Sequence, residues 1–554
     1  MSRRGLSVAV ALLLLGTTGA AAALADGPSG TPTGGPSGGT AVDQCYAHAS
    51  SQVDDSGYKL CRSMQAAEWV AAAACRMPER SAGATDRCGA VDGRTVDEAQ
   101  VAAYENSWVH RALTLQRGLA VDAPLWEAQF PHTHNSFNSS AYAVPTDGSA
   151  PSYYPTLTNQ DPNQVYSITD QLRMDIRAIE IDLHWVPSPY GTPQTHGYWP
   201  TMCHGDAQQP GDGGPYVHVG CTDDRPMQDG LAELRRWLDA NPDQFVLLYL
   251  ENQLFPGEAG ASQQQAHDVA AHIVDQQLGS LVYTPPSGLP AGTCAPMPYD
   301  ETQADMLAQG KRVLIVGNCG PGAWNQWVFT RGPAWDESGD PTTYGAKDCA
   351  ADEAAREQHT SFRRWYEESP WLEAMTDATQ VLTPQTTAAM VRCGVNLVGF
   401  DQLQPFDGRL AAFVWSWADG EPSSGGTCAV QGGDTRFHAA ACGRRHPFAC
   451  VDANLDWHVT AGIGRWTDGR RVCEQEFPGS TFAVPPNGYR NAQLTAAKHG
   501  DDTVWLDYAV VGGHWRPDAL VDPPPPGDNH GRGHAYGHAY GHGTSHGRGH
   551  HRAP

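Results

Sequence analysis

The sequence predicts an α/β protein built on a TIM-type (β/α) barrel, with a disulfide-stapled helical extension before it and a β-rich region after it. The first observation is a series of short apolar segments at 245–250, 312–316 and 396–400, which alternate with amphipathic helical stretches. Continuous apolar runs of this length are typical of strands buried on both faces of a parallel sheet. The second observation is the length of the alternating region 125–410, about 280 residues, which suits a (β/α)₈ barrel.

The first 25 residues predict a signal peptide. The basic segment Ser2-Arg3-Arg4 precedes a largely apolar stretch, and a run of small residues follows and ends at Ala25. This order of basic, apolar and small segments is typical of exported proteins. The arginine pair also occurs in twin-arginine signals, so Sec and twin-arginine export both stay open. We therefore expect a secreted, extracellular protein.

The next two segments differ in composition. Residues 26–44 are rich in Gly, Pro, Ser and Thr and predict a linker. Residues 45–124 predict a helical extension that carries Cys45, Cys61, Cys75 and Cys88. The chain has 14 cysteines, an even count, so disulfides are the expected state in an exported protein, with their pairing left open.

Within 125–410, predicted strands and helices follow one another. Residues 176–182 predict a strand, and residues 262–278 predict a helix. Residues 230–240 predict another helix, with Leu231, Leu234 and Leu238 on one face. A doubly wound open sheet is the structural alternative, but no glycine-rich phosphate loop follows the first strand.

After residue 410 the amphipathic helical stretches no longer recur. Residues 411–520 are rich in Trp, Gly and Cys and predict a β-rich region that caps the barrel. Residues 521–554 contain a proline run followed by Gly-His-Ala-Tyr repeats, which predict a disordered tail.

The charge of the chain limits its partners. The net charge of −25 argues against nucleic acid and weakens any attraction to an anionic lipid surface. No segment after the signal peptide is long and apolar enough to span a membrane. Trp324, Trp327, Phe329 and Trp335 follow a predicted strand, so peripheral membrane contact through these residues and simple packing of the loop both stay open.

Four short motifs carry polar residues that suit a catalytic site. They are His132-Thr133-His134-Asn135-Ser136, Glu180-Ile181-Asp182, Cys203-His204-Gly205 and Leu250-Glu251-Asn252. Each can lie at or near the carboxyl end of a barrel strand, where barrel active sites are built.

The residue types in these motifs belong to one chemistry. Alternation places Glu180 and Asp182 on the same face of their strand. Clustered carboxylates repel one another and need a cation or a shared proton. Oxygen ligands without cysteine favour a hard ion such as calcium or magnesium. Two histidines beside such an ion suit phosphoryl chemistry, in which one supports attack and the other protonates the leaving oxygen.

In their order along the chain, these motifs resemble the catalytic X region of the phosphatidylinositol-specific phospholipase C family, in its calcium-dependent branch. The resemblance includes Arg177-x-x-Glu180-x-Asp182 and covers 125–410. The metal-independent bacterial branch has an arginine where calcium would bind. The resemblance implies that His134 and His204 are the catalytic histidines. It also implies that the Ca²⁺ ligands are Asn135, Glu180, Asp182 and Glu251.

The resemblance further implies an intramolecular reaction on a phosphoinositide substrate. Calcium would lower the pKa of the inositol 2-hydroxyl, whose proton passes to a ligand carboxylate or to His134. His134 would also stabilise charge on the phosphorus, and His204 would protonate the diacylglycerol oxygen as it leaves. Segment 313–317 lacks the Lys-x-Lys with which the animal enzymes contact ring phosphates. We therefore expect unphosphorylated phosphatidylinositol to be the preferred substrate.

Two other functions stay open. A glycerophosphodiester phosphodiesterase shares the barrel, the Glu-x-Asp pair and metal dependence, although its usual His-Arg opening is replaced here by His134-Asn135. A catalytically inactive secreted binding protein would need broken catalytic positions, and both histidines and all four ligand positions are intact.

The β-rich region resembles C-type lectin-like domains with their two ends in reversed order, so a permuted copy and a degenerate copy both stay open. Trp417-x-x-Gly420-Glu421-Pro422 and the cysteines that follow are similar to the end of such a domain, and 473–506 is similar to its beginning. Phe437 replaces a tryptophan, and Ala439 occupies the usual acidic metal position. Glycan binding and a scaffold without it both stay open.

Overall fold

The structure is a computed structural model that describes residues 98–517, all within one compact unit, apart from short gaps. The gaps are 143–162, 189, 212–213, 220, 222–224, 257–261, 291, 332–334, 338–339, 369–379 and 407. The predicted signal peptide, linker, tail and first four cysteines lie outside the described residues. No described helix combines the length and apolar character needed to cross a membrane.

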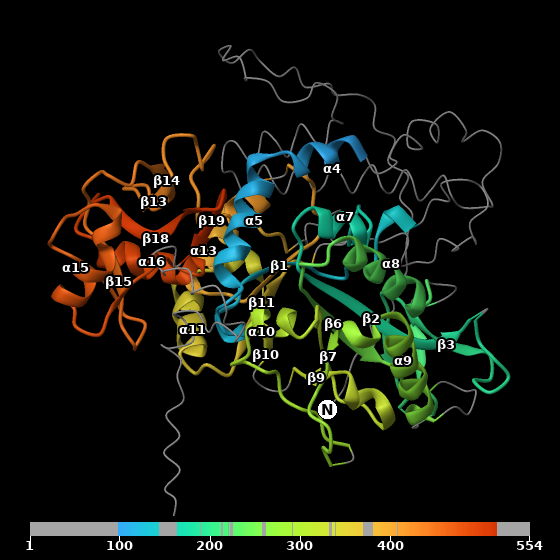
Figure 1. The fold of residues 1–554 in the computed structure, drawn as a ribbon. Helices are drawn as coiled ribbons and strands as arrows, with labels where there is room; N and C mark the ends of the chain where they lie inside the picture. Colours follow the sequence, from blue (N-terminus) through green and yellow to red (C-terminus); the bar gives the residue numbers. More distant parts are fainter. Residues whose placement is uncertain are drawn as a thin grey trace, which may run out of the picture. The chain divides into compact units, whose positions relative to one another are not determined.

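A ten-stranded sheet forms the centre of the fold (Figure 1). Its hydrogen-bonded order is β10-β11-β12-β1-β2-β6-β8-β7, with β3 paired to β2 and β9 paired to β8. All of these pairings are parallel except that of β2 with β3. The strands are β1 Phe130–Thr133, β2 Ala178–Pro187, β3 Tyr198–Met202, β6 Val246–Gln253, β7 Val282–Tyr283, β8 Val313–Gly317, β9 Phe329–Thr330, β10 Trp335–Glu337, β11 Phe362–Tyr366 and β12 Leu397–Phe400.

The strands follow the chain around this sheet. β1 lies between β12 and β2, with Thr133 opposite both Phe400 and Ile179, and β6 and β8 come next. This is the neighbour order of a (β/α) barrel. In the part of the chain that the structure describes, no ladder joins β9 to β10. The structure therefore confirms a curled parallel sheet of the α/β class, and closure into a full TIM barrel stays a prediction.

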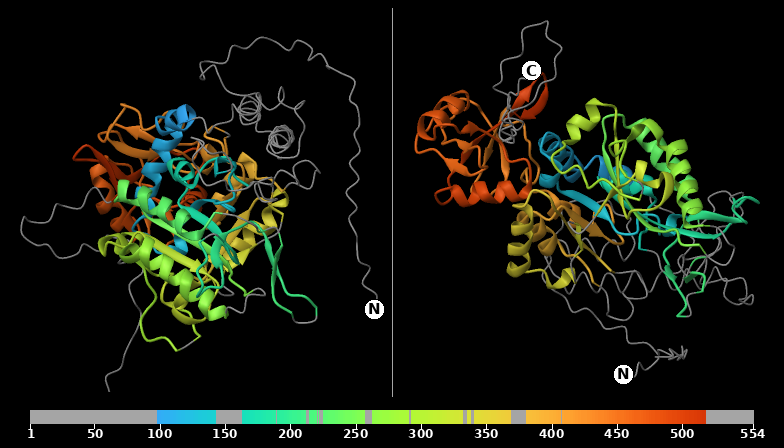
Figure 2. Two further views of the ribbon diagram at one scale, coloured as in Figure 1. Left: turned by 90° about the vertical axis from the view of Figure 1, so that its right-hand side faces the viewer. Right: turned by 90° about the horizontal axis from the view of Figure 1, so that it is seen from below.

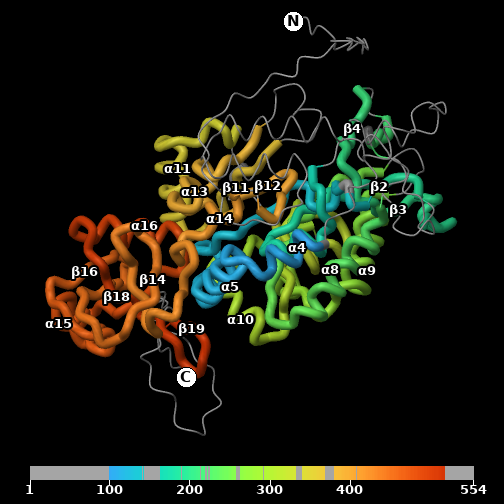
Figure 3. Tube along the Cα trace, turned by 90° about the horizontal axis from the view of Figure 1, so that it is seen from above, coloured from blue at the N-terminus to red at the C-terminus, as the bar shows by residue number. Residues whose placement is uncertain are grey.

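Helices cover the outer side of the sheet. α8 and α9 pack against each other, as two viewing directions show (Figures 1 and 2). α11 and α13 also pack together, and α11 contacts β11 (Figure 3). The predicted helices 230–240 and 262–278 correspond to α8 and α9. The bounds are α7 Ile168–Arg173, α8 Met227–Ala240, α9 Gln263–Gln277, α10 Gln303–Ala308, α11 Ala346–Arg356, α13 Pro384–Cys393 and α14 Arg409–Phe413.

The two faces of β2 have different surroundings. Ile179, Ile181 and Leu183 belong to the large apolar core that the outer helices share. Ala178 belongs to a smaller apolar cluster with residues of β6, β8 and β12, which fills the inner side of the curled sheet. Because side chains alternate along a strand, Glu180 and Asp182 extend from the same inner face as Ala178, beyond this apolar cluster.

The inner side is crowded at Gly399 of β12. A Cβ atom at this position would lie 2.6 Å from Cβ of Tyr366 and 2.9 Å from Cδ2 of His132. Real Cβ atoms do not approach other atoms so closely, so this position needs glycine. The missing side chain lets β11 and β1 bring their polar residues to the same space.

Two helices precede the sheet, α4 Glu98–Glu105 and α5 Trp108–Ala120. Asp175, just before β2, binds both of them through Tyr104 Oη at 2.8 Å, His110 Nδ1 at 2.9 Å and Arg117 Nη1 at 2.6 Å. Burial alone would raise the pKa of Asp175, but Arg117 and His110 lower it to about 2. A buried, fully partnered carboxylate thus fastens the end of the helical extension to the sheet.

The C-terminal region is β-rich, as the sequence predicts. It contains a four-stranded sheet in the order β14-β13-β18-β19 and a three-stranded sheet in the order β16-β15-β17. Its C-type lectin-like character and glycan binding stay predictions. The bounds are β13 Cys428–Gln431, β14 Phe437–Ala440, β15 Ala449–Val451, β16 Trp457–Val459, β17 Thr481–Phe482, β18 Val504–Val511, β19 His514–Pro517, α15 Gly469–Glu476 and α16 Gly488–Ala497.

Glu127, just before β1, joins this region to the central sheet. Its fully buried carboxylate accepts hydrogen bonds from Arg356 Nη1 at 3.0 Å, from Arg490 Nε at 3.0 Å and from Asn487. Burial alone would raise the pKa of Glu127, but Arg490 and Arg356 lower it. Arg490 belongs to α16, and Asn487 caps that helix. The C-terminal region therefore supplies part of the charge that keeps Glu127 ionised.

All ten cysteines within the described residues are paired. The disulfides are Cys203–Cys221, Cys294–Cys319, Cys349–Cys393, Cys428–Cys442 and Cys450–Cys473.

Candidate active site

The four sequence motifs meet at the carboxyl ends of neighbouring strands. His134 follows β1, Asp182 lies in β2, and Glu251 lies in β6. His204 follows β3, which pairs with the carboxyl-terminal half of β2. The structure thus brings the residues predicted from four separate segments to one end of the sheet.

Three carboxylates form a cluster there. Glu180 and Asp182 are buried, and Glu251 is half-buried and opposite Asp182 in the β2–β6 register. One oxygen from each lies within 4.8 Å of the others. Oδ1 of Asp182 is buried without a hydrogen-bond partner. Burial, and then the charges of Glu251 and Glu180, raise the pKa of Asp182 well above its ordinary value.

Asn135 and Ser136 form the turn that fastens β1 to β2. The backbone N–H of Asn135 donates to Oε2 of Glu180 at 3.1 Å, and Ser136 Oγ accepts from the backbone N–H of Glu180 at 2.9 Å. Asn135 has a φ of 45°, in the left-handed region that asparagine tolerates better than most residues. The local backbone conformation therefore places Asn135 beside the carboxylate cluster.

His134 is buried and held on several sides. Its Nδ1 lies 3.2 Å from Oδ1 of Asp401, which follows β12. Its backbone carbonyl accepts from Nε2 of Gln164 at 2.7 Å, and the same amide donates to the carbonyl of Phe400 at 2.8 Å. The ring packs against Tyr366, with centroids 4.6 Å apart. These contacts fix the orientation of the imidazole.

His204 is half-buried and connects to the same network through amides. Nδ2 of Asn138 donates to Nδ1 of His204 at 3.1 Å and to Oδ1 of Asn163 at 2.7 Å. Nδ2 of Asn163 in turn donates to Oδ2 of Asp401 at 3.2 Å. Because the Asn138 amide acts as a donor, neutral His204 carries its proton on Nε2.

The two histidines differ in protonation in the substrate-free chain. Burial alone would lower the pKa of His134, but Asp401, with Glu180 and Glu368 adding to its effect, raises it to about 10. Burial and the positive charge of His134 lower the pKa of His204 to about 4. At neutral pH, His134 is therefore charged and His204 is neutral.

Arg364 of β11 lies against the carboxylate cluster. Its Nη2 donates to Oε2 of Glu180, and its guanidinium carbon lies 4.2 Å from the centroid of Tyr366 and 5.2 Å from that of Tyr249. Burial alone would raise the pKa of Glu180, but Arg364 and then His132 lower it. Glu180 is thus ionised, whereas Asp182 holds a proton more readily.

Sequence reasoning missed Asp401 and Arg364. Asp401 directly follows the apolar segment 396–400, so the rule that points to polar residues at strand ends also applies to it. Arg364 lies in β11, Phe362-Arg363-Arg364-Trp365-Tyr366, which is buried over most of its length. The two adjacent arginines interrupt the apolar run that would otherwise predict a buried strand. No local pattern distinguishes that segment from a loop.

The aromatic loop after β8 is packed. Trp324 is fully buried, and its Nε1 donates to the carbonyl of Asn318 at 3.0 Å. Phe329 is buried as well, and Trp327 packs against the large apolar core. Membrane contact through Trp324 and Phe329 is therefore the wrong interpretation of this loop, because these side chains are inside the protein. The side chain of Trp335 lies outside the described residues.

Several known proteins resemble this chain. A family model described as the Rv2075c PI-PLC-like domain matches residues 92–407. The uncharacterized protein Rv2075c of Mycobacterium tuberculosis H37Rv is 36% identical over 437 residues, which are 76% of this chain and 84% of that protein. The uncharacterized protein MT2135 of strain CDC 1551 matches to the same extent.

Solved structures match at lower similarity. A phosphatidylinositol-specific phospholipase C from Listeria monocytogenes has 12% identity and a TM-score of 0.32, covering 54% of this chain and 98% of that one. A calcium-dependent phospholipase C from Pseudomonas sp has 15% identity and a TM-score of 0.28, covering 52% of this chain and 95% of that one. The family assignment rests on the family model and on the mycobacterial relatives. The chain belongs to the Rv2075c PI-PLC-like domain family.

Proposed function

We propose that this protein is a secreted, calcium-dependent phosphodiesterase that cleaves phosphatidylinositol to diacylglycerol and inositol cyclic phosphate. The observation that carries the proposal is the meeting of two histidines and three carboxylates at one end of a parallel sheet. Membership of a PI-PLC-like family supports the reaction class. The paired cysteines of the described residues support secretion, because disulfides persist in oxidising compartments.

The donor set fits a hard divalent cation. Glu180, Asp182 and Glu251 supply only oxygen atoms. Oε2 of Glu180 is paired with Arg364, whereas the buried Oδ1 of Asp182 has no hydrogen-bond partner. A cation at this position would satisfy that oxygen and relieve the repulsion that raises the pKa of Asp182. We assign Asn135, Glu180, Asp182 and Glu251 as the residues that would hold Ca²⁺. A bound calcium ion would supply positive charge to a phosphoryl oxygen and lower the pKa of the attacking inositol 2-hydroxyl.

The protein's own residues would do the remaining chemistry. His134, charged and held by Asp401, would stabilise negative charge on the phosphorus in the transition state. A carboxylate of the cluster, or His134 in its neutral form, would accept the proton of the 2-hydroxyl. An anionic phosphodiester beside His204 would raise the pKa of that histidine and let it protonate the departing diacylglycerol oxygen.

The experiment uses the purified full chain and three substrates. Phosphatidylinositol in mixed micelles, glycerophosphoinositol and glycerophosphocholine are each incubated with calcium or with excess chelator, and the products are identified by ³¹P NMR. We expect inositol cyclic phosphate from both inositol substrates only when calcium is present. Cleavage of glycerophosphocholine with release of glycerol phosphate would favour the glycerophosphodiesterase alternative, and no cleavage of any substrate would favour the inactive binding protein.

A matched pair of variants links the result to the cluster. Asp182→Asn should abolish calcium-stimulated turnover, whereas Asp239→Asn, the same change at an exposed position of α8, should leave it unchanged. Full turnover of the wild-type chain in excess chelator would contradict calcium dependence.

A further inference from the structure

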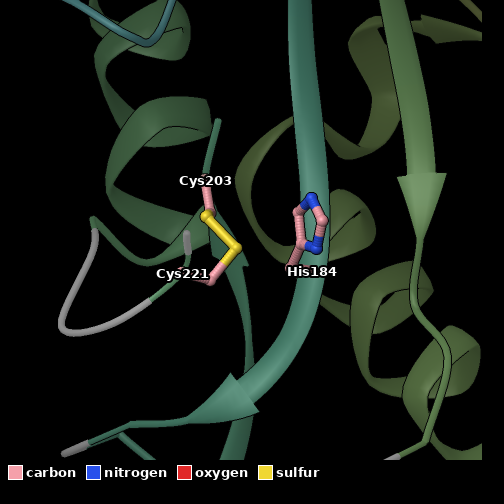
Figure 4. Close-up of side chains that lie close together, drawn as sticks. All are labelled: His184, Cys203 and Cys221. Atoms are coloured by element: carbon pink, nitrogen blue, oxygen red, sulfur yellow. A yellow bond between two sulfur atoms is a disulfide. The ribbon is translucent and has the colours of Figure 1, made fainter. Parts of the chain in front are cut away.

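Two histidines and a disulfide converge beside the proposed active site. His184 lies on the inner face of β2, two residues after Asp182, and the Cys203–Cys221 disulfide lies next to its ring (Figure 4). A ring nitrogen of His184 and the sulfur atoms of Cys203 and Cys221 lie within 4.8 Å of one another. His218, on β5 (Val217–Val219), faces His184 with their Nδ1 atoms 2.8 Å apart.

The hydrogen bonds around the two rings determine which nitrogens carry protons. The carbonyl of Phe255 lies 2.9 Å from Nε2 of His218 and can only accept, so this nitrogen carries the hydrogen. Nδ1 of His218 then accepts from Nδ1 of His184, and Nε2 of His184 carries no hydrogen. That Nε2 atom is buried without a hydrogen-bond partner. A purely structural histidine would leave this lone pair unsatisfied at a cost in stability.

The arrangement of His184 is the one that metal-binding histidines use. Such a histidine typically donates its outer N–H to a hydrogen-bond acceptor, which turns its other nitrogen toward the metal. His184 donates from Nδ1 to His218, which is itself held by the carbonyl of Phe255, and Nε2 of His184 stays available as a ligand. The backbone N–H of Cys221 donates to the carbonyl of His218 at 3.3 Å, so His218 and Cys221 belong to the same turn.

We propose that the chain with reduced Cys203 and Cys221 binds one zinc ion through these two thiolates and Nε2 of His184, with His218 as the hydrogen-bond partner that orients the His184 ring. Two thiolates and one imidazole are typical zinc ligands, and a tetrahedral site with three protein ligands has its fourth position open to water. This inference does not depend on the proposed phosphodiesterase activity. The Cys203–Cys221 disulfide of the present structure is the oxidised, zinc-free form of the same link.

The exchange between the two forms balances. An external dithiol reduces the disulfide to two thiols and becomes a disulfide itself. Zinc then binds both sulfurs as thiolates and releases two protons. In the reverse direction, an external disulfide oxidises the two thiolates to the Cys203–Cys221 bond. The external disulfide takes up two protons and becomes two thiols, and the zinc ion leaves.

Either link between Cys203 and Cys221, the disulfide or the zinc ion, would restrain the segment that carries His204. Cys203 directly precedes His204, and its backbone N–H donates to the carbonyl of Asp182 at 3.3 Å. A link from Cys203 to Cys221 therefore restrains the position of His204, whether a sulfur–sulfur bond or a zinc ion makes it. A newly made chain could in this way keep its site assembled before oxidation.

Cobalt spectroscopy of the full chain tests the site without measuring catalysis. The metal-free chain is reduced under anaerobic conditions, and a thiol assay confirms that Cys203 and Cys221 are free. It is then titrated with Co²⁺ and afterwards with Zn²⁺. We expect the visible bands of tetrahedral cobalt and a sulfur-to-cobalt charge-transfer band, both reaching a plateau at one equivalent and both removed by zinc.

Three variants separate this site from the other thiols. The double variant Cys203→Ser/Cys221→Ser should lose both bands, whereas Cys428→Ser/Cys442→Ser, which removes a disulfide of the C-terminal region, should keep them. His218→Asn retains all cysteines and should weaken cobalt binding by roughly 10–100-fold, the effect of losing a ligand's outer hydrogen-bond partner.

Several outcomes would overturn the proposal. One is the absence of cobalt bands in the reduced wild-type chain. Another is bands of wild-type intensity in Cys203→Ser/Cys221→Ser. If that double variant does not fold, an unchanged cobalt affinity in His218→Asn is decisive against the site.

Discussion

Nδ1 of His134 lies 3.2 Å from Oδ1 of Asp401, although the two residues are 267 positions apart in the sequence. The contact exists because β1 and β12, the first and last strands of the curled sheet in chain order, are hydrogen-bonded neighbours. It makes Asp401 the group that outweighs burial and raises the pKa of His134 to about 10. The proposed reaction therefore depends on a residue outside the four sequence motifs.

Asp401→Asn should lower the pKa of His134 and the catalytic rate together. The raised pKa means that the folded state favours charged His134; this contribution to stability is complete below pH 6.5 and disappears as pH rises through about 10. Without the carboxylate, we expect His134 to titrate at lower pH and turnover to fall by roughly a hundredfold. NMR titration of the His134 Cε1–H signal and initial rates measure both effects. An unchanged titration midpoint would show that Asp401 does not control His134.

Replacing His134 or His204 with alanine should reduce phosphatidylinositol turnover by at least about a hundredfold. The two variants should respond differently to an aryl inositol phosphodiester, whose leaving group needs no proton. This substrate should restore much of the activity of His204→Ala and little of that of His134→Ala. The reverse pattern would assign the acid role to His134. His438→Ala, in the C-terminal region, serves as the control for a general effect of losing a histidine.

The pKa of His204 should rise when an anionic ligand binds. Burial and charged His134 hold it at about 4 in the free chain, so neutral His204 is the resting form. A phosphate beside the ring favours the protonated form. We expect the NMR titration midpoint of His204 to move upward in the presence of inositol 1-phosphate. A midpoint that stays in place would contradict the proposed role as a general acid.

Calcium binding should tighten as pH rises and should release a proton. Burial and the neighbouring carboxylates raise the pKa of Asp182, so calcium must displace the proton that this group holds at low pH. Calorimetric titrations in buffers of different ionisation enthalpy count the released protons. Asp182→Asn should release none at this site and bind calcium more weakly. A calcium affinity independent of pH across the acidic range would rule out this coupling.

The C-terminal region should be needed for stability. Arg490→Ala removes a guanidinium that binds the fully buried Glu127, and loss of one partner of such a pair costs about 3–5 kcal/mol. Urea unfolding measures this cost. Arg235→Ala, which breaks the exposed ion pair with Asp239, should cost less than about 1 kcal/mol. For the same reason, a chain that ends near residue 410 should fail to fold stably. A well-folded truncation would contradict the importance of Glu127.

The segments that folded as predicted are those with a strong local pattern. The apolar runs 245–250, 312–316 and 396–400 became β6, β8 and β12, because a strand buried on both faces needs apolar side chains throughout. The leucines of 230–240 lie in α8 for a similar local reason. β9 and β10 have only two and three residues, too few to show a period. Closure of the barrel could therefore be expected only from its overall length.

Local patterns in the sequence point to the polar residues proposed for the chemistry: His134, Asn135, Glu180, Asp182, His204 and Glu251 each lie beside an apolar or motif-bearing segment. The tertiary structure alone decided their partners. Arg364 contacts Glu180 across 184 positions, and His218 meets His184 through a hairpin with no strong periodicity. Ion pairs and hydrogen bonds between distant segments depend on how the strands are ordered in space. That order cannot be predicted from the periodicity of the sequence. The proposed roles of the site residues follow from local sequence, whereas their protonation states depend on neighbours that only folding brings into contact.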